Sequence, residues 1–575
     1  MASEEAEVEL ESNTFDSDPR PGPPSASGMT RRRLLAGAAQ VGAGVTGASL
    51  LAACGSSSSS SHSGTASNAS NNPAGALSEL PGGTPKKGGT FTVGVISGGQ
   101  EENLFPGTAV GTPDFVRDYT LYNLLFYLGR DITPLVPGLA LSAEPNKDAT
   151  VWTFKLRSGV TWHDGKPFGA DDVVYNFKAI WSNPAKDFSS GFLAGLIDFK
   201  SVKAVDKLTV QVPLHTAVAQ FPTIFAYFDF PVVQNGATPK STATNPIGTG
   251  PFKYVSFSPG SQSVFEANPD YWESGKPYVD RLVVDSSFTD NNAIFNALLS
   301  GKINLFPTLP LVTARQQASA KQVQILASSF AAESYMFLMR VDKGPFADNR
   351  VREAFKTLVD RQAMIDGAWA GFGAPAYDLL APGTQYYASD LKRTQDTEKA
   401  KSLFKAAGVL GDTFILPTSD FLPGMVESAT ILSQQAAAAG VKVVVKTTSA
   451  ATYFTPAGGF LSRSFGQEVD QPVGSLTAAY LSEYTLSAPY PDTHWGKQAG
   501  GAADEKLISQ AIAATNTSQA ASLWRQCQEQ QFNQGGYLVW GNLAYVDAAA
   551  NDVRGLQAGA GFSYNSWRLQ DGWIS

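Results

Sequence analysis

Hydrophobic and polar residues alternate along two stretches in the first half of the chain, a pattern typical of β-strands. The stretches are residues 89–96 (GTFTVGVI) and 151–162 (VWTFKLRSGVTW), and the second continues through a glycine-containing turn. The following residues, 170–181 (ADDVVYNFKAIW), place apolar side chains at helical spacing, with Asp171 or Asp172 available as the cap. This part of the chain therefore predicts strands and helices together.

The second half of the chain shows the same mixture. Residues 348–365 predict a helix capped by Asp348 or its neighbour, and residues 397–408 (TEKAKSLFKAAG) predict a helix that ends at a glycine. Between residues 414 and 448 the pattern is strand, helix, strand, the order of a parallel βαβ unit. The aromatic, strand-like residues 535–548 could return to the first part of the fold. The fold class expected is α/β.

The N-terminal 53 residues have the order of an export signal. Three arginines at 31–33 precede an uncharged run, residues 34–53, that is rich in glycine and alanine. TRRRLL resembles the twin-arginine signal, and LAAC resembles the lipobox at which bacterial lipoproteins are lipidated and cut, which would make Cys54 the lipidated first residue. The alternative is an ordinary transmembrane helix, and Met29 is a second possible start. Residues 54–87, rich in serine and asparagine, predict a flexible tether.

Composition excludes several classes of function. The 575 residues are 43% hydrophobic and 16% charged with a net charge of −8, which gives no electrostatic footprint for nucleic acid. The two cysteines are Cys54 and Cys527, so a lipidated Cys54 leaves no disulfide and no thiolate zinc site. The four histidines are scattered. We expect no metal and no cofactor.

Four separated blocks carry a family resemblance. Residues 132–177, 245–254, 267–284 and 344–355 resemble the family 5 extracellular solute-binding proteins, the peptide- and nickel-type receptors of ABC importers. The resemblance implies a two-lobed periplasmic-binding-protein-like fold of type II with an extra subdomain in lobe one. The expected division is a signal peptide (1–53), a tether (54–87), lobe I (88–125, 246–332 and 535–575), a lobe I subdomain (126–245) and lobe II (333–534).

The resemblance also implies a function. It predicts a monomeric receptor, lipid-anchored to the extracytoplasmic face of a bacterial cell membrane, which closes by a hinge on a small solute and delivers it to an ABC permease. No catalytic group is needed for that role. The alternatives are an exported hydrolase of sugars or peptides, which would need two facing carboxylates, and a sensor or chaperone on the same fold.

The predicted ligand contacts depart from the family pattern. Residues 487–496 (SAPYPDTHWG) resemble the family's cleft segment, in which the first Asp of Ala-Asp-Tyr-Pro-Asp-Pro receives the ammonium group in peptide-binding members. That position is Pro489 here, while Asp492 matches the second Asp. Arg340 stands where many relatives have Asn, and Phe126 where the family commonly has Glu. The predicted ligand-binding residues are Phe126, Arg340, Tyr490, Asp492, His494 and Trp495.

These departures predict a non-peptide or atypical peptide ligand. A peptide-like, glycosidic or anionic solute would use the fixed cation of Arg340 to bind a carboxylate or phosphate. The alternative is that Arg340 pairs with Asp342 or Glu333, that Trp495 belongs to the core, and that a carboxylate such as Glu483 replaces the missing Asp.

Three further motifs are interpreted as structural. WHDGKPF (162–168) contains adjacent His and Asp, but neighbours on a strand point to opposite faces and Asp-Gly is a turn signal. IGTGPF (247–252) lacks the Lys and Ser or Thr of a phosphate-binding loop. NPDYW (268–272) predicts a turn with aromatic packing.

Overall fold

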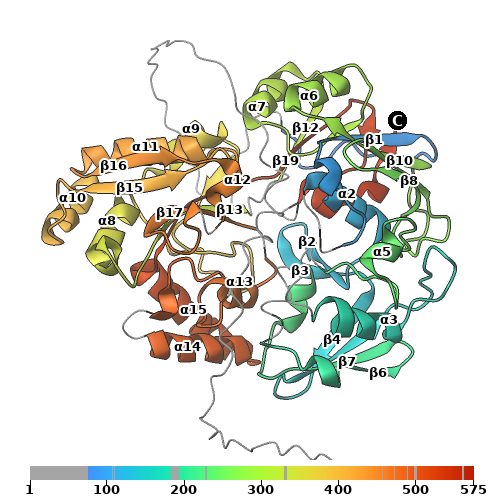
Figure 1. Cartoon of the computed structure of the whole chain (residues 1–575), viewed down its shortest axis with the longest axis horizontal. Coiled ribbons are helices and arrows are strands. Elements are labelled where there is room, and N and C mark those ends of the chain that lie inside the picture. Colours follow the sequence, from blue (N-terminus) through green and yellow to red (C-terminus); the bar gives the residue numbers. More distant parts are fainter. Residues whose placement is uncertain are drawn as a thin grey trace, which may run out of the picture.

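The computed structural model describes residues 76–575 except 107, 109–110, 183–192, 194, 227–229, 329–332, 456–457, 472, 489, 498–500 and 560–561. Figure 1 shows two bodies side by side, with the blue and green elements in one and most of the yellow and orange elements in the other. The predicted signal peptide and Cys54 lie outside the described residues. Within the described part of the chain, no helix combines the length and apolarity needed to cross a membrane.

A seven-stranded mixed sheet forms the centre of the first body. Its strands, in spatial order, are β12 (Gln324–Ala327), β19 (Val546–Ala549), β11 (Leu305–Phe306), β1 (Thr90–Ile96), β10 (Arg281–Phe288), β9 (Gln262–Ala267) and β8 (Phe252–Ser258). β1 pairs in parallel with β10 and β11, and the other pairs are antiparallel. The helices packed against this sheet are α2 (Thr112–Leu121), α6 (Asn291–Leu299), α7 (Leu311–Ala320) and α16 (Ser563–Trp567).

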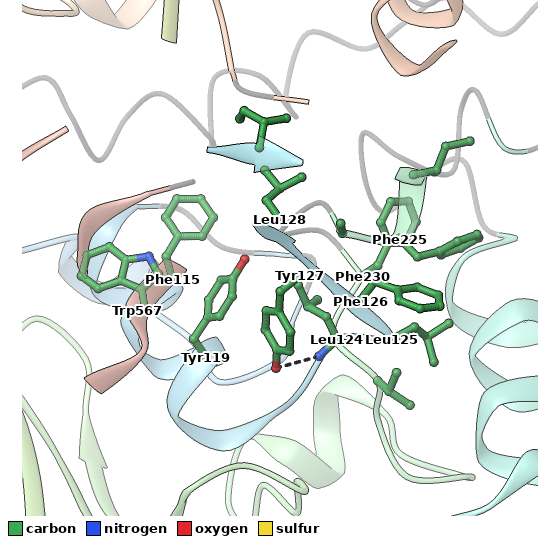
Figure 2. Packing of buried hydrophobic residues seen from close by; sticks show 14 of the residues in the cluster. Phe115, Tyr119, Leu124, Leu125, Phe126, Tyr127, Leu128, Phe225, Phe230 and Trp567 are labelled. Carbon is green, nitrogen blue, oxygen red and sulfur yellow. Dashed lines mark hydrogen bonds between the residues drawn. The ribbon is translucent and has the colours of Figure 1, made fainter. Parts of the chain in front are cut away.

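A smaller sheet lies below the first (Figure 1) and is built from residues of the predicted subdomain. Its strands, in order, are β4 (Ala140–Pro145), β5 (Val151–Leu156), β7 (Thr209–Pro213) and β6 (Lys203–Asp206). The ribbon β2 (Phe126–Gly129) with β3 (Ile132–Pro137), the helices α3 (Ala170–Tyr175) and α5 (Pro239–Thr242), and the 3₁₀ helix η5 (Phe221–Ala226) complete this part. Figure 2 shows Phe126, Phe225 and Phe230 on one side of β2, and Phe115, Tyr119 and Trp567 on the other.

The second body contains a four-stranded antiparallel sheet in the order β14 (Gly373–Pro375), β18 (Tyr537–Leu543), β13 (Glu333–Met339) and β17 (Phe465–Asp470). A separate parallel pair is formed by β15 (Thr413–Thr418) and β16 (Lys442–Thr447). The helices of this body are α8 (Asn349–Leu358), α9 (Arg361–Trp369), α10 (Thr397–Ala406), α11 (Met425–Ala438), α12 (Ala450–Tyr453), α13 (Leu476–Glu483), α14 (Gly501–Ala513) and α15 (Thr517–Gln534). A two-stranded ribbon, β20 (Val553–Arg554) with β21 (Trp573–Ile574), ends the chain in the first body.

Local patterns predicted most of these elements. The expected strand–helix–strand unit is β15, α11 and β16, and its strands are parallel as predicted. The predicted helix at 348–365 is instead two helices, because Asp360 leaves helical geometry and its side chain accepts a hydrogen bond from the backbone N–H of Ala363 at 2.9 Å. At α3 the N-cap is Gly169, whose N–H donates to Asp172 at 2.9 Å, so neither aspartate is itself the cap.

The chain crosses between the two large sheets twice within the described strands. β12 belongs to the seven-stranded sheet and the next strand, β13, to the four-stranded one. β18 belongs to the four-stranded sheet and β19 to the seven-stranded one. We propose that the lobe boundaries fall in the connections between β12 and β13 and between β18 and β19, the second of these later than the residue 535 expected from the sequence.

The motifs interpreted as structural turns pack against the end of α2. The N–H of Gly250 donates to the backbone oxygen of Leu121 at 2.9 Å, and a Cβ on Gly248 would overlap that same oxygen. The N–H of His163 donates to the carbonyl of Gly248 at 2.9 Å, and burial lowers the pKa of the His163 ring to about 4. Backbone packing accounts for these glycines.

Candidate functional site

Arg340 follows β13 directly, and its guanidinium is paired within the protein. Nε donates to Oδ1 of Asp342 at 2.6 Å, Nη2 donates to Oδ2 at 3.0 Å, and Nη1 donates to the carbonyl oxygen of Ser462 at 3.1 Å. The hydrogen bonds from Arg340 hold the pKa of Asp342 below its usual range. The sequence allowed Arg340 to be either a ligand-binding cation or part of an ion pair within the protein. In the structure it is paired with Asp342.

The predicted cleft segment runs beside Arg340 and is largely buried. His494 lies with Nε2 3.0 Å from the carbonyl oxygen of Leu461 and Nδ1 3.8 Å from Oδ2 of Asp342. Burial lowers the pKa of His494, which favours the neutral ring at neutral pH. Trp495 and Asp492 are only 1% and 2% exposed. The segment therefore braces β13 in this conformation, and its role in ligand contact stays a prediction.

The remaining predicted residues are placed in packed surroundings. Tyr490 is buried with its ring 6.5 Å from that of Phe460. The ring of Phe126 lies 6.3 Å from that of Phe154 in the subdomain core, where Figure 2 shows it. Pro489 lies outside the described residues. The packing gives Phe126 a structural role, and a ligand contact there remains untested.

Glu483 is not a free replacement for the missing aspartate. Its Oε2 accepts a hydrogen bond from the hydroxyl of Tyr537 at 2.6 Å, and its Oε1 accepts one from Ser482 at 3.2 Å. The residue is 2% exposed at the end of α13. These bonds commit Glu483 to fixing α13 against β18.

The two crossings bring together a polar group that the sequence did not single out as a site. Gln471, directly after β17, donates from Nε2 to Oε1 of Glu333 at 2.7 Å and accepts from the hydroxyl of Tyr545 at 2.9 Å. Glu333 begins β13, and Tyr545 lies between β18 and β19. The sequence signal was a single Glu opening an otherwise apolar strand (ESYMFLM). The sequence alone suggests Glu333 only as a partner for Arg340.

Hydrogen bonds also join the subdomain to the second body. Thr223 of η5 lies with its hydroxyl 2.7 Å from that of Ser475, the N-cap of α13. Thr477 donates to Gln220 at 3.1 Å, and Gln220 donates to Gln385 at 3.3 Å. A Cβ on Gly474 would contact the backbone of Thr223, so the two parts approach closely at this point. All of these side-chain partners are uncharged.

The described residues contain no group of three or more His, Cys, Asp or Glu side chains arranged to hold a metal ion. Cys527 is buried, and burial raises the pKa of its thiol to about 12, which makes it a poor nucleophile. The geometry therefore offers a binding scaffold in which polar side chains from both bodies meet.

Comparison with known proteins agrees with this architecture. Residues 134–496 match the model of the bacterial extracellular solute-binding proteins, family 5. The chain belongs to family 5 of the bacterial extracellular solute-binding proteins. It is thus an extracytoplasmic, non-enzymatic receptor of an ABC importer, and the hydrolase alternative has no support.

Similar family members are known in sequence and in structure. The dipeptide-binding protein of Escherichia coli K12 is 27% identical over 476 residues, which cover 77% of this chain and 88% of that protein. Heme-binding protein A of Haemophilus influenzae is 27% identical over 458 residues, covering 74% and 82%. The crystal structure of NikA from Brucella suis with Fe(III)-EDTA superposes with a TM-score of 0.73 at 19% identity, covering 85% of this chain and all of that one. These structures show the two-lobed type II fold.

Proposed function

We propose that this family 5 receptor is lipid-anchored and closes its two lobes on a small organic solute, which it then delivers to an ABC permease. The contact between subdomain and α13 carries the argument. It includes the uncharged pairs Thr223–Ser475 and Thr477–Gln220, at 2.7 and 3.1 Å. Neutral hydrogen bonds contribute a net of about 0.5–1.5 kcal/mol each, so a bound solute can decide between open and closed forms.

The class of ligand depends on which charged side chains are not already paired within the protein. The guanidinium of Arg340 already donates to Asp342 and Ser462, which argues against this residue as the clamp for an anionic solute. Relatives are named for binding dipeptide, heme or glutathione, so membership of the family does not fix the ligand. We propose a peptide-like or other small organic solute.

The anchor rests on sequence. Cys54 is the last residue of the lipobox-like LAAC, and a serine-rich stretch follows it. The tether predicted over residues 54–87 is too long, because Leu80 is 2% exposed and its backbone N–H donates to the carbonyl of Leu556 at 2.8 Å, so residues 76–87 pack against the first body. We propose a tether over residues 54–75, and a flexible chain of that length has a root-mean-square reach of about 25 Å.

The test is thermal unfolding of the full chain, purified in mild detergent, against dipeptides, tetrapeptides, sugars, amino acids, organic anions, amines and metal chelates. A ligand present at about a hundred times its dissociation constant adds about 2.7 kcal/mol to the free energy of unfolding. At least one class of solute should raise the melting temperature, with calorimetry giving a stoichiometry of one. If no class shifts it, the receptor assignment is overturned, and release of product from a library member would revive the hydrolase.

A further inference from the structure

Glu333 is a buried acid with no cation beside it among the described residues. Asp547 and Glu483 also lack a cation among these residues, but each accepts at least two hydrogen bonds from the protein. Glu102 lies 2.6 Å from Arg117, and Asp378 lies 2.9 Å from Arg361, so each of these has a cation as partner. Glu333 is 9% exposed, and among the described residues its carboxylate accepts one hydrogen bond, from Gln471 to Oε1. Its Oε2 has no donor within that part of the protein.

An isolated buried carboxylate is unfavourable, because the protein interior solvates the charge less well than water does. Such a group takes up a proton, gains further hydrogen bonds or pairs with a cation. Burial raises the pKa of Glu333, and a hydrogen bond from the neutral amide of Gln471 opposes this only in part. The missing countercharge is what a cationic ligand would bring.

Glu333 lies where the chain passes from one lobe to the other, a position from which it could contact a ligand held between the lobes. It starts β13 at the crossing from β12, while Tyr545 sits on the crossing between β18 and β19. The backbone N–H of Ser328 donates to the carbonyl of Tyr545 at 3.1 Å, which holds the two crossings together. Hinge motion of either lobe would act on this point.

Aromatic rings extend from the cluster of Glu333, Gln471 and Tyr545 toward the first lobe. The ring of Tyr545 lies 5.8 Å from that of Phe562, which stacks on Phe115 at 5.9 Å. Tyr545 and Phe562 are both half-buried. Rings of this kind attract cations through their π faces.

We propose that Glu333 binds a protonated amine of the transported solute, with Gln471 orienting the carboxylate and the rings of Tyr545 and Phe562 flanking the ammonium group. This inference rests on the proposed receptor function and narrows its ligands to amines. It assigns the ammonium-binding role to a residue distant in sequence from Pro489.

The test compares probes that differ only in the charged amine. Thermal unfolding and calorimetry are run on the full chain with dipeptides, putrescine and choline, and with the N-acetylated forms of the same dipeptides. At least one free amine should bind, and its acetylated or otherwise neutral counterpart should bind at least tenfold more weakly. Glu333→Gln should lower the affinity for that amine at least tenfold, and Tyr545→Leu should lower it severalfold.

Glu398→Gln is the matched control, since it removes the same charge from the exposed face of α10 and should leave affinity unchanged. Circular dichroism shows whether each variant is folded. If Glu333→Gln does not fold, the Tyr545→Leu variant still tests the proposal. If solutes bind but amines do not, or if Glu333→Gln and Tyr545→Leu both bind the amine normally, the ammonium site is wrong and the receptor function stands. If the wider solute library also fails to bind, the receptor function itself fails.

Discussion

Arg340 and Glu333 stand at opposite ends of β13 and show how surroundings decide what a charge does. Arg340 finds Asp342 two residues along the chain and a carbonyl oxygen from Ser462. Among the described residues, the carboxylate of Glu333 accepts a hydrogen bond only from the neutral amide of Gln471, 138 residues away. Asp342 compensates the charge of Arg340, whereas no described cation lies beside Glu333, which is why we propose Glu333 as the ligand contact.

Replacing Arg340 should cost stability rather than affinity. Arg340→Met leaves Asp342 without its cation in a largely buried position, and we expect the free energy of unfolding to fall by about 2–4 kcal/mol in urea titrations. Arg350→Met is the control, because the exposed pair with Asp348 is worth under about 1 kcal/mol. A stable Arg340→Met variant that had lost ligand affinity would restore the ligand role predicted from the sequence.

Glu333→Gln should stabilise the ligand-free protein at neutral and higher pH. Burial raises the pKa of Glu333 from 4.5 to about 7, so between these values the folded state holds a proton that the unfolded state has lost. This group therefore lowers the free energy of unfolding as pH rises from 4.5 to 7, by about 3 kcal/mol in total. The gain from Glu333→Gln should be absent at pH 4.5 and complete near pH 8 in urea titrations. A gain that does not change with pH would show that the carboxyl group is not buried as described.

At the scale of elements, close backbone contacts fix how helices meet turns. α2 ends against the loop before β8, where Gly248 and Gly250 touch the backbone of Leu121. The glycines of IGTGPF (247–252) resemble those of a phosphate-binding loop, but their contact with the backbone of Leu121 explains them. The break between α8 and α9 has a similarly local cause in the cap formed by Asp360.

Adding a methyl group at the α2 contact should disrupt it. Gly248→Ala places a Cβ onto the backbone oxygen of Leu121, which cannot move as a side chain does, and we expect a loss of about 2–4 kcal/mol. Gly82→Ala is the control, because a Cβ there meets nothing within 4 Å and should change stability by less than about 0.5 kcal/mol. Differential scanning calorimetry measures both. Equal melting temperatures would mean that the turn relaxes freely.

At the scale of the whole molecule, two sheets joined by crossings form a receptor whose parts have separate tasks. The seven-stranded sheet and the four-stranded sheet each have their own helices, and the chain passes between the sheets from β12 to β13 and from β18 to β19. A hinge at these crossings would leave both sheets intact while changing the contacts of Thr223 with Ser475.

Anchoring should be separable from binding. Cys54→Ser removes the proposed lipidation site, and we expect the protein to move from the detergent phase to the aqueous phase in Triton X-114 partitioning of expressing bacteria. Ligand affinity should be unchanged, because Cys54 lies more than 20 residues ahead of Leu77, where the chain first pairs with the folded body. Retention of Cys54→Ser in the detergent phase would favour an uncleaved transmembrane segment.

Features that depend on neighbouring residues can be predicted from the amino-acid sequence. Periodicity located β1, β5, α10 and the parallel unit of β15, α11 and β16, since strands and helices follow from spacing along the chain. The family blocks gave the two-lobed architecture and the receptor function. The spacing of two residues made a pair between Arg340 and Asp342 possible, but it did not distinguish this pair from one with Glu333 or from a ligand contact.

The compensation of charges and the sheet that each strand joins depend on contacts between residues far apart in sequence. β18 and β19 are separated by two residues, yet pair in different sheets, because each finds its partner strand far away in sequence. The surroundings of Glu333 likewise come from Gln471 and Tyr545, more than 130 residues distant. Burial and charge compensation are properties of packing in three dimensions, and a pattern of neighbouring residues does not contain them.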